Sequence, residues 1–507
     1  MLKGMFEMNI SRRQFLIGGA AFASLGAFGG NRFMLAAAGF KAGDKPRLKF
    51  GVLSDIHITK IGSGEKMSAG GNNLTFKHAL EWFRSQGVDA VVVAGDMADM
   101  GLDENLMAVA DAWYSVFPDD KYPDGRRVEK VFVTGNHDWI GYMYGAAAAK
   151  KYPDETERVK HILQKDMAGW WERAFHESYS PIYAKQIKGY AFIGSHWDGV
   201  QAGSGGCDQP FGLIADYMAA NAKKIDPSIP FFYVQHPHLK DTCYGPWALG
   251  HDAGIATKTL SSHSNAIAFS GHSHYSLTDE RSIWQGAFTS VGTGSLRYTE
   301  AADKELPLTG YENTGGGDRR ANAAKSLRKF SGGDCRNGML WSVYDDCITV
   351  KRREFLSDYD LGEDWVMPLP AAESRPFAFA ERAKHLHAPE FPANAVLEIT
   401  AASVKNRGGK SKDGKPGFKV VAPSVVADDK ARLFSLEFTA ETPDGKKQTK
   451  RVLAEGFNHS LKHKKAQSRQ VCYFRKDELG AGDVRFMVTP LNCFGARGRP
   501  LTAGLKA

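Results

Sequence analysis

The chain has 507 residues, 43% of them apolar and 24% charged, and this length predicts two or three folded units. Such a composition excludes a disordered protein, and six cysteines without a Cys-x-x-Cys pair exclude a small disulfide scaffold and a zinc knuckle. The net charge of +8 is uneven: residues 401–507 sum to +12 and residues 39–400 to −7. A basic C-terminal part indicates either a solvated basic face or attachment to an anionic polymer, and its lysines are too scattered to predict specific nucleic-acid binding.

Residues 1–38 have the layout of a bacterial export signal. Arg12 and Arg13 precede an uncharged Gly- and Ala-rich stretch over residues 17–30, and three alanines end at residue 38. The paired arginines followed by Phe-Leu resemble a twin-arginine signal, which implies export of the folded chain to the periplasm or another extracytoplasmic compartment. No later apolar stretch reaches the roughly 18 residues of a membrane span, so we expect no transmembrane segment in the mature chain. An even number of cysteines permits disulfides there, with Cys335–Cys347 and Cys472–Cys493 as two conceivable pairs.

The next segment predicts an α/β domain over residues 45–368. Short β-branched runs at 49–54, 90–94 and 131–134 are typical of strands buried on both faces, and a helical pattern covers 74–86. The pattern repeats with strands at 189–195, 231–235 and 266–270 and a helix at 213–224. Residues 140–180 predict a helical excursion over the first half, and strand character returns over 338–355.

The C-terminal part has a different pattern. Residues 369–384, which begin with Leu-Pro-Ala, predict a linker. Short alternating runs at 395–400, 417–421, 433–440, 471–475 and 484–490 then predict a small all-β sandwich over residues 385–507. The ending at 488–498 resembles the last strands of a fibronectin type III or immunoglobulin-like module.

Polar motifs stand at the carboxyl ends of the predicted α/β strands, where open α/β sheets place their sites. In chain order they are Asp55-Ile56-His57, Gly95-Asp96, Gly135-Asn136-His137-Asp138, His236 and Gly271-His272-Ser273-His274. This ordered set resembles the calcineurin-like metallophosphoesterase superfamily, and the resemblance covers roughly residues 48–300. It implies a four-layer α/β/β/α sandwich, so the expected fold is this sandwich followed by the small all-β domain.

The resemblance also implies a dinuclear metal centre. Two cations held close together repel one another, and a shared carboxylate offsets that repulsion. Asp96 is the expected bridge. By the family pattern, Asp55, His57 and His274 complete one site, and Asn136, His236 and His272 complete the other. These ligand types accept two divalent or trivalent ions, with Mn, Fe, Zn and Co all suitable.

The implied reaction is in-line hydrolysis of a phosphate-ester substrate by a metal-bound hydroxide. His137 is the expected general acid for the leaving group. Asp138 either fixes the tautomer of His137 or simply caps a turn. Three further residues are expected to contact the substrate or to have a structural role: His196, His238 and Arg297.

The subtype is indicated by two positions. The purple acid phosphatase branch has a Tyr where this chain has Asp99 and lacks the His of the first motif, whereas His57 is present here. The pattern matches the phosphodiesterase branch, but it also occurs in monoesterases. The expected function is therefore an exported phosphodiesterase, with a phosphomonoesterase on the same site and an inactive surface-binding scaffold as alternatives. The basic C-terminal module is a candidate anchor to an anionic envelope polymer.

Overall fold

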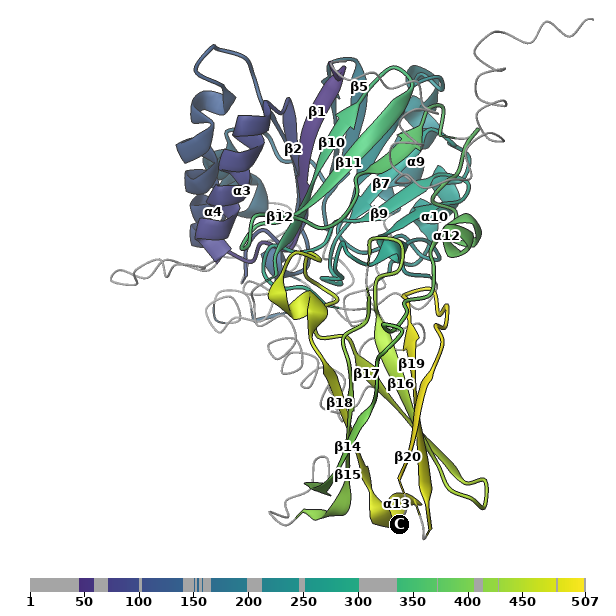
Figure 1. The fold of residues 1–507 in the computed structure, drawn as a ribbon. Coiled ribbons are helices and arrows are strands. Elements are labelled where there is room, and N and C mark those ends of the chain that lie inside the picture. Colours follow the sequence, from purple (N-terminus) through teal and green to yellow (C-terminus); the bar gives the residue numbers. More distant parts are fainter. Residues whose placement is uncertain are drawn as a thin grey trace, which may run out of the picture.

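The computed structural model describes residues 45–58, 72–99, 103–139, 150, 153–154, 157, 166–197, 212–245, 251–300, 335–371, 373–404, 414–426, 428–479 and 482–505. The predicted export signal lies outside these residues. Of the helical excursion predicted over 140–180, the main described element is the helix α8 (Met167–Phe175). Figure 1 shows an α/β body built from the first part of the chain and the long strands of the C-terminal part extending below it.

The first sheet has the strand order β12-β11-β10-β1-β2-β3, with β13 also paired to β11. Its parallel part is formed by β1 (Leu48–Leu53), β2 (Ala90–Ala94) and β3 (Glu129–Val133), in which almost every residue is buried. The remaining strands add antiparallel: β10 (Asn337–Val343), β11 (Cys347–Glu354), β12 (Tyr359–Asp360) and β13 (Trp365–Pro368).

The second sheet has the strand order β4-β5-β6-β7-β9-β8. The strands β5 (Tyr190–Ser195), β6 (Phe231–Val234), β7 (Ala266–Ser270) and β9 (Thr289–Gly292) are parallel, and β4 (Ile182–Ile187) and β8 (Ile283–Gln285) are antiparallel edge strands. Both sheets therefore contain consecutive parallel strands, whose carboxyl ends can share one site.

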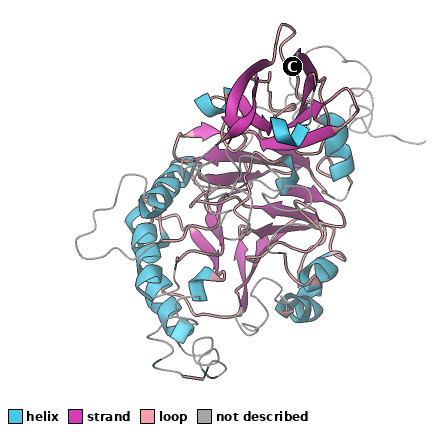
Figure 2. Ribbon diagram, turned by 90° about the horizontal axis from the view of Figure 1, so that it is seen from below, coloured by secondary structure: helices cyan, strands magenta, loops and turns pink. Residues whose placement is uncertain are grey.

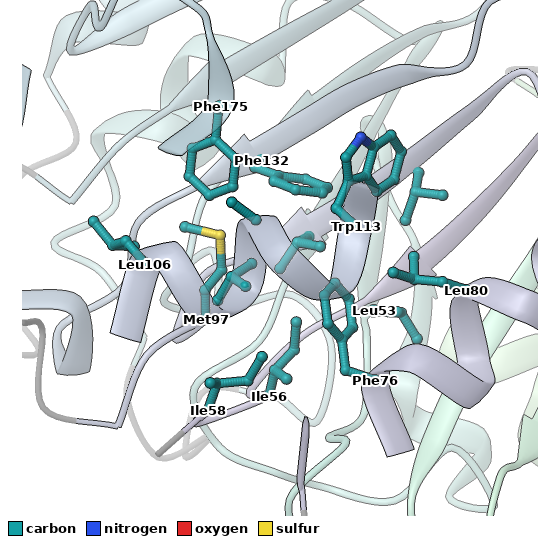
Figure 3. Close-up of a cluster of buried hydrophobic side chains, with 14 of the residues drawn as sticks. Leu53, Ile56, Ile58, Phe76, Leu80, Met97, Leu106, Trp113, Phe132 and Phe175 are labelled. Carbon is teal, nitrogen blue, oxygen red and sulfur yellow. The ribbon is translucent and has the colours of Figure 1, made fainter. Parts of the chain in front are cut away.

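The two sheets pack face to face, and helices cover their outer faces (Figure 2). Phe50 of β1 lies at the centre of the inter-sheet core, with ring centroids 5.2 Å from Phe192 and 4.9 Å from Phe232. The first sheet is covered by α8, α3 (Asn72–Gln86) and α4 (Asp103–Val116), whose core is drawn in Figure 3. The second is covered by α9 (Leu213–Asn221) and α10 (Ile255–Leu260). The expected four-layer α/β/β/α order is confirmed.

The C-terminal part forms two further antiparallel sheets with an apolar core between them. One contains β14 (Glu398–Val404), β15 (Lys415–Ala422) and β18 (Gln470–Arg475). The other has the order β17-β16-β19-β20, formed by β16 (Ser435–Glu441), β17 (Lys447–Leu453), β19 (Val484–Leu491) and β20 (Leu501–Leu505). The short helix α13 (Lys476–Leu479) follows β18. A separate all-β unit thus follows the α/β body, as expected.

Other sequence predictions need adjustment. The cysteines of the two conceivable disulfides, Cys335, Cys347, Cys472 and Cys493, are thiols in the structure. The segment predicted as a linker contains the start of the helix α12 (Phe379–His385), and Arg382 on this helix forms an ion pair with Glu280 of the α/β body. Within the described ranges, no helix combines the length and apolarity that a bilayer span requires.

Candidate metal centre

The candidate ligands lie at the carboxyl ends of five strands. In the first sheet Asp55 and His57 follow β1, Asp96 follows β2 and Asn136 follows β3. In the second sheet His236 follows β6, and His272 and His274 follow β7. Because the sheets pack face to face, these seven side chains meet at one end of the sandwich, as the motif order predicts.

One donor set surrounds Asp55. Its Oδ1 lies 3.1 Å from His274 Nε2 and 4.0 Å from His57 Nε2. The two imidazole Nε2 atoms are 3.3 Å apart, and His57 Nε2 is 3.5 Å from Asp96 Oδ2. Together these four residues offer converging donor atoms that could hold a metal ion.

The other donor set lies on the opposite side of the same Asp96 oxygen. His236 Nε2 is 3.2 Å from Asp96 Oδ2, 3.1 Å from Asn136 Oδ1 and 3.2 Å from His272 Nδ1. Asp96 Oδ2 is thus shared by both sets, which is the position of a bridging carboxylate. Ligand atoms about 2.0 to 2.2 Å from one ion lie roughly 3 to 4 Å from one another, so both sets fit divalent ions.

Burial and charge give the same indication. Asp55 and Asp96 are 0% and 1% exposed, and the imidazoles that face them are also largely buried. Desolvation opposes ionisation of Asp55, but the neighbouring His274 outweighs it and lowers the pKa of that carboxyl. Desolvation also lowers the pKa of His57 to about 4 and that of His272 to about 3, which keeps these imidazoles neutral, as metal ligation requires.

The backbone carries strain at the ligands. Asp55, His57, Asp96, His272 and His274 all have φ between 50° and 70°, the left-handed region that non-glycine residues rarely adopt. Each such conformation costs on the order of 1 kcal/mol or more, and strain of this kind concentrates at functional sites. The turns after β1, β2 and β7 are therefore shaped to aim side chains rather than to continue regular structure.

Three motif glycines permit close backbone approach. A Cβ at Gly95, which has φ 88°, would overlap the His236 ring. A Cβ at Gly135 would overlap Asp96 and His236, and one at Gly271 would overlap Ser54 and Asp55. The glycines of the Gly-Asp, Gly-Asn-His-Asp and Gly-His-x-His motifs thus make room for ligands that come from neighbouring strands.

A second layer of hydrogen bonds orients the ligands. His236 Nδ1 lies 2.8 Å from the Ala94 carbonyl, which directs Nε2 into the site. Ser295 Oγ is 3.2 Å from His274 Nδ1, and the Ser54 hydroxyl donates to Asp55. Such partners fix the tautomer and the rotamer of a ligand. The sequence motifs do not reveal Ser54 or Ser295, because their partners are set by tertiary contact.

The two expected catalytic residues have different positions. His137 is partly exposed beside the His57 ring, and its Nδ1 lies 2.9 Å from the Asp99 carbonyl oxygen. Asp138 is buried, and the partner of His137 Nδ1 in the structure is the Asp99 carbonyl rather than the Asp138 carboxylate. Its carboxylate accepts from the backbone N–H groups of Ala98 (2.7 Å) and Gly135 (2.8 Å), and it therefore ties the turn after β2 to the turn after β3. Desolvation and the nearby Asp96 raise the pKa of Asp138 to about 7.

The expected substrate contacts divide into two groups. His196 is buried among aromatic rings and accepts from the Thr134 N–H at 3.1 Å, and burial lowers its pKa to about 3. His238 is buried between Ser270 and Ser273, at 2.8 and 2.6 Å, and so supports the turn that carries His272. Both histidines have structural surroundings rather than an open face towards substrate.

Arg297 lies at the site, as expected, but it is already paired with the Asp99 carboxylate. Asp99 Oδ1 is also 3.3 Å from His57 Nδ1. The geometry of His57, Asp99 and His137 could in itself hold a cation. Because the Asp99 carboxylate contacts both His57 and Arg297, it connects a candidate ligand to this arginine. In the sequence pattern, Asp99 stands out only as a subtype marker.

Comparison with known proteins agrees with this geometry. Residues 48–276, which contain all seven candidate ligands, match the model of the Calcineurin-like phosphoesterase family.

Among solved structures, a dimetal phosphatase from Danio rerio is similar, with 13% identity over 64% of this chain and 99% of that chain and a TM-score of 0.36. A purple acid phosphatase from yellow lupin (Lupinus luteus) has 12% identity over 63% and 53%, with a TM-score of 0.38. Vps29 from Entamoeba histolytica has 9% identity over 63% and 99%, with a TM-score of 0.26. The search of the curated proteins gave no match. The α/β body thus has a metallophosphoesterase fold, within which residues 48–276 match that family model.

Proposed function

We propose that this protein hydrolyses phosphate esters at a dinuclear metal centre bridged by Asp96. The observation that carries the proposal is the position of Asp96 Oδ2, 3.5 Å from His57 Nε2 in one donor set and 3.2 Å from His236 Nε2 in the other. Two bound ions would supply Lewis acidity for a phosphoryl oxygen and would activate a water molecule. The oxygen and imidazole donors suit Mn, Fe, Zn or Co.

Other residues of the site have separate roles in proton transfer and in the charge of each donor set. His137 donates its Nδ1 proton to the Asp99 carbonyl, which leaves Nε2 to exchange a proton with the leaving-group oxygen. Asn136 contributes a neutral amide oxygen, so its donor set carries less negative charge than the set with Asp55. The strained turns and the buried second layer hold these groups before substrate arrives, which lowers the reorganisation needed during reaction.

We propose phosphodiesters as the first substrate class and phosphomonoesters as the alternative on the same site. The preference for diesters rests on Arg297, whose positive charge is already neutralised by the Asp99 carboxylate. A diester, which carries one negative charge, needs less additional positive charge than a dianionic monoester.

The experiment is hydrolysis of bis-p-nitrophenyl phosphate beside p-nitrophenyl phosphate, with Mn²⁺ added and after chelation. The wild-type chain is expected to cleave the diester faster, and chelation should abolish activity. Asp96→Ala should be inactive, whereas Asp111→Ala, which removes an exposed carboxylate on α4, should behave as wild type. Activity that survives both chelation and Asp96→Ala would refute the proposal, and faster monoester cleavage would reverse the order of substrates.

We also propose that the protein acts outside the cytoplasm and that its C-terminal sandwich attaches to anionic envelope polymer. Support for export comes from Arg12, Arg13 and the apolar stretch after them. Replacement of both arginines by lysine should leave the full chain in the cytoplasm, as followed by cell fractionation. An unchanged distribution would contradict the twin-arginine route. Support for attachment comes from the net charge of +12 over residues 401–507.

A further inference from the structure

The C-terminal sandwich reaches a candidate metal ligand through Tyr298. The Tyr298 ring lies against the His274 imidazole, with centroids 4.3 Å apart and an angle of 36° between the rings. Tyr298 also packs against an apolar cluster of the sandwich, which we call the Phe457 cluster. Its buried members are Phe434, Leu453, Ala454 and Phe457.

A second contact between the sandwich and the α/β body consists of hydrogen bonds from side chains to backbone carbonyls. Asn458, next to Phe457, donates its side-chain N–H to the Thr299 carbonyl at 3.3 Å, and its own carbonyl accepts from the Cys335 thiol. Arg432 donates to the His459 carbonyl at 2.7 Å and to the Leu361 carbonyl at 3.1 Å. The loop after β17 is therefore fastened to the α/β body on both sides of Asn458.

The segment that receives these contacts holds His274. The Glu300 N–H donates to the His274 carbonyl at 2.6 Å, and the Ser276 N–H donates to the Glu300 carbonyl at 2.9 Å. Ser295 Oγ, which contacts His274 Nδ1, also accepts from the Tyr298 N–H at 3.3 Å. Residues 295–300 thus contact His274 at three places: Glu300 at its backbone carbonyl, Ser295 at its ring nitrogen and Tyr298 at its ring face. A displacement of this segment therefore displaces the ligand.

We propose that the C-terminal sandwich is a positioning part of the metal centre, which sets the metal affinity of the site containing His274 through Tyr298 and Asn458. This inference rests on the proposed function, since it assigns a role towards the same ions. It distinguishes the sandwich from an independent appendage, because the residues at the junction touch a candidate ligand rather than only the outer surface of the α/β body.

The test is a Mn²⁺ titration of the metal-stripped full chain, followed by calorimetry and by metal analysis after dialysis. Wild type is expected to bind two ions. Tyr298→Ala and Phe457→Ala should weaken one of the two affinities by roughly 10- to 100-fold and leave the other near wild type, as substitutions behind metal ligands do. Tyr298→Phe should retain both affinities, because the ring rather than the hydroxyl contacts His274.

Two further variants separate positioning from general loosening. Phe418→Ala removes a buried ring from the core between the two sandwich sheets, away from the Phe457 cluster, and should leave both affinities unchanged. Asn458→Ala removes the bond to Thr299 and less buried volume than Phe457→Ala removes. It should weaken the same affinity as Phe457→Ala, which keeps the test decisive where Phe457→Ala folds poorly.

The outcomes separate the inference from the proposed function. Wild-type affinities in both Phe457→Ala and Asn458→Ala would overturn the inference, as would equal weakening by Phe418→Ala. A wild-type chain that binds no Mn²⁺ would instead overturn the dinuclear centre itself.

Discussion

The His137 ring is held through Nδ1, which contacts the Asp99 carbonyl. The proposed role of its Nε2 as a general acid gives a kinetic prediction. His137→Asn should lower kcat by about 10²- to 10⁴-fold for esters with poor alkyl leaving groups, because such groups depend on a general acid. The loss should be much smaller for p-nitrophenyl esters, whose leaving group needs no proton, and the metal content should be unchanged. Steady-state kinetics over a series of leaving groups checks this. Equal losses across the series would contradict the acid role.

His196 gives a pH prediction for stability. Burial lowers its folded-state pKa from the usual 6.5 to about 3, so between these values the unfolded chain binds a proton that the folded chain does not. Stability should therefore fall as the pH decreases from 6.5 towards 3, by up to ~1.4 kcal/mol per pH unit from this residue. Urea unfolding at several pH values measures the slope.

The matched variants for this slope are His196→Gln, whose amide oxygen can accept from Thr134, and His385→Gln, which changes an exposed histidine on α12. The first should flatten the dependence and the second should not. An unchanged slope in His196→Gln would show that other groups cause the acid sensitivity.

At the scale of single residues, the sequence predicts what the motifs contain. Asp55, Asp96 and His236 follow apolar strands in a recognisable order, so their convergence could be anticipated. The role of Asp138 could not, because its partners include the backbone N–H groups of Met97 and Ala98, which follow a different strand. His238 likewise depends on Ser270 and Ser273, which no local pattern connects to it.

At the scale of elements, the close packing of the turns that follow the strands predicts how a glycine substitution affects metal binding. A Cβ at Gly135 would overlap Asp96 and His236, so Gly135→Ala should displace ligands of both donor sets. We expect at least a roughly tenfold loss of Mn²⁺ affinity in a titration of the full chain. Gly169→Ala is the control, since Gly169 lies in the helix α8 with open space around its Cα. It should be neutral or stabilise by about 0.5 to 1 kcal/mol. Wild-type affinity in Gly135→Ala would remove the packing argument.

Buried parallel strands were the predictable elements and edge strands were not. β2 reads Ala-Val-Val-Val-Ala and is buried at every position, so its sequence alone is sufficient to predict a buried strand. β17 reads Lys-Gln-Thr-Lys-Arg-Val-Leu and is mostly solvent-facing, so its pairing with β16 decides its conformation. The short edge strand β8 is fixed by its neighbour β9 in the same way.

At the scale of the whole molecule, the charge of the sandwich predicts salt-sensitive attachment. Many of its cations already have acidic partners, such as Lys415 with Asp477 at 2.7 Å and Lys450 with Glu478 at 3.1 Å. Lys462 and Lys464 are exposed beside the loop that reaches the α/β body. The full chain should bind an immobilised polyanion at low ionic strength and be released near physiological salt, where the Debye length is about 8 Å.

The variants for this attachment carry equal charge changes. Lys462→Glu with Lys464→Glu should weaken retention, whereas Lys223→Glu with Lys224→Glu, two exposed residues of the α/β body, should not. Equal retention of the two double variants would argue against a docking role for the sandwich. The junction between the α/β body and the sandwich could not be predicted from the sequence, because the contact between Tyr298 and the Phe457 cluster joins residues over 100 positions apart.

The most direct test of the account is anomalous diffraction from Mn²⁺-soaked crystals of the full chain. Two anomalous peaks are predicted, one on each side of the Asp96 carboxylate. One should lie among Asp55, His57 and His274, and the other among Asn136, His236 and His272. A single peak, or peaks away from Asp96, would contradict the dinuclear centre.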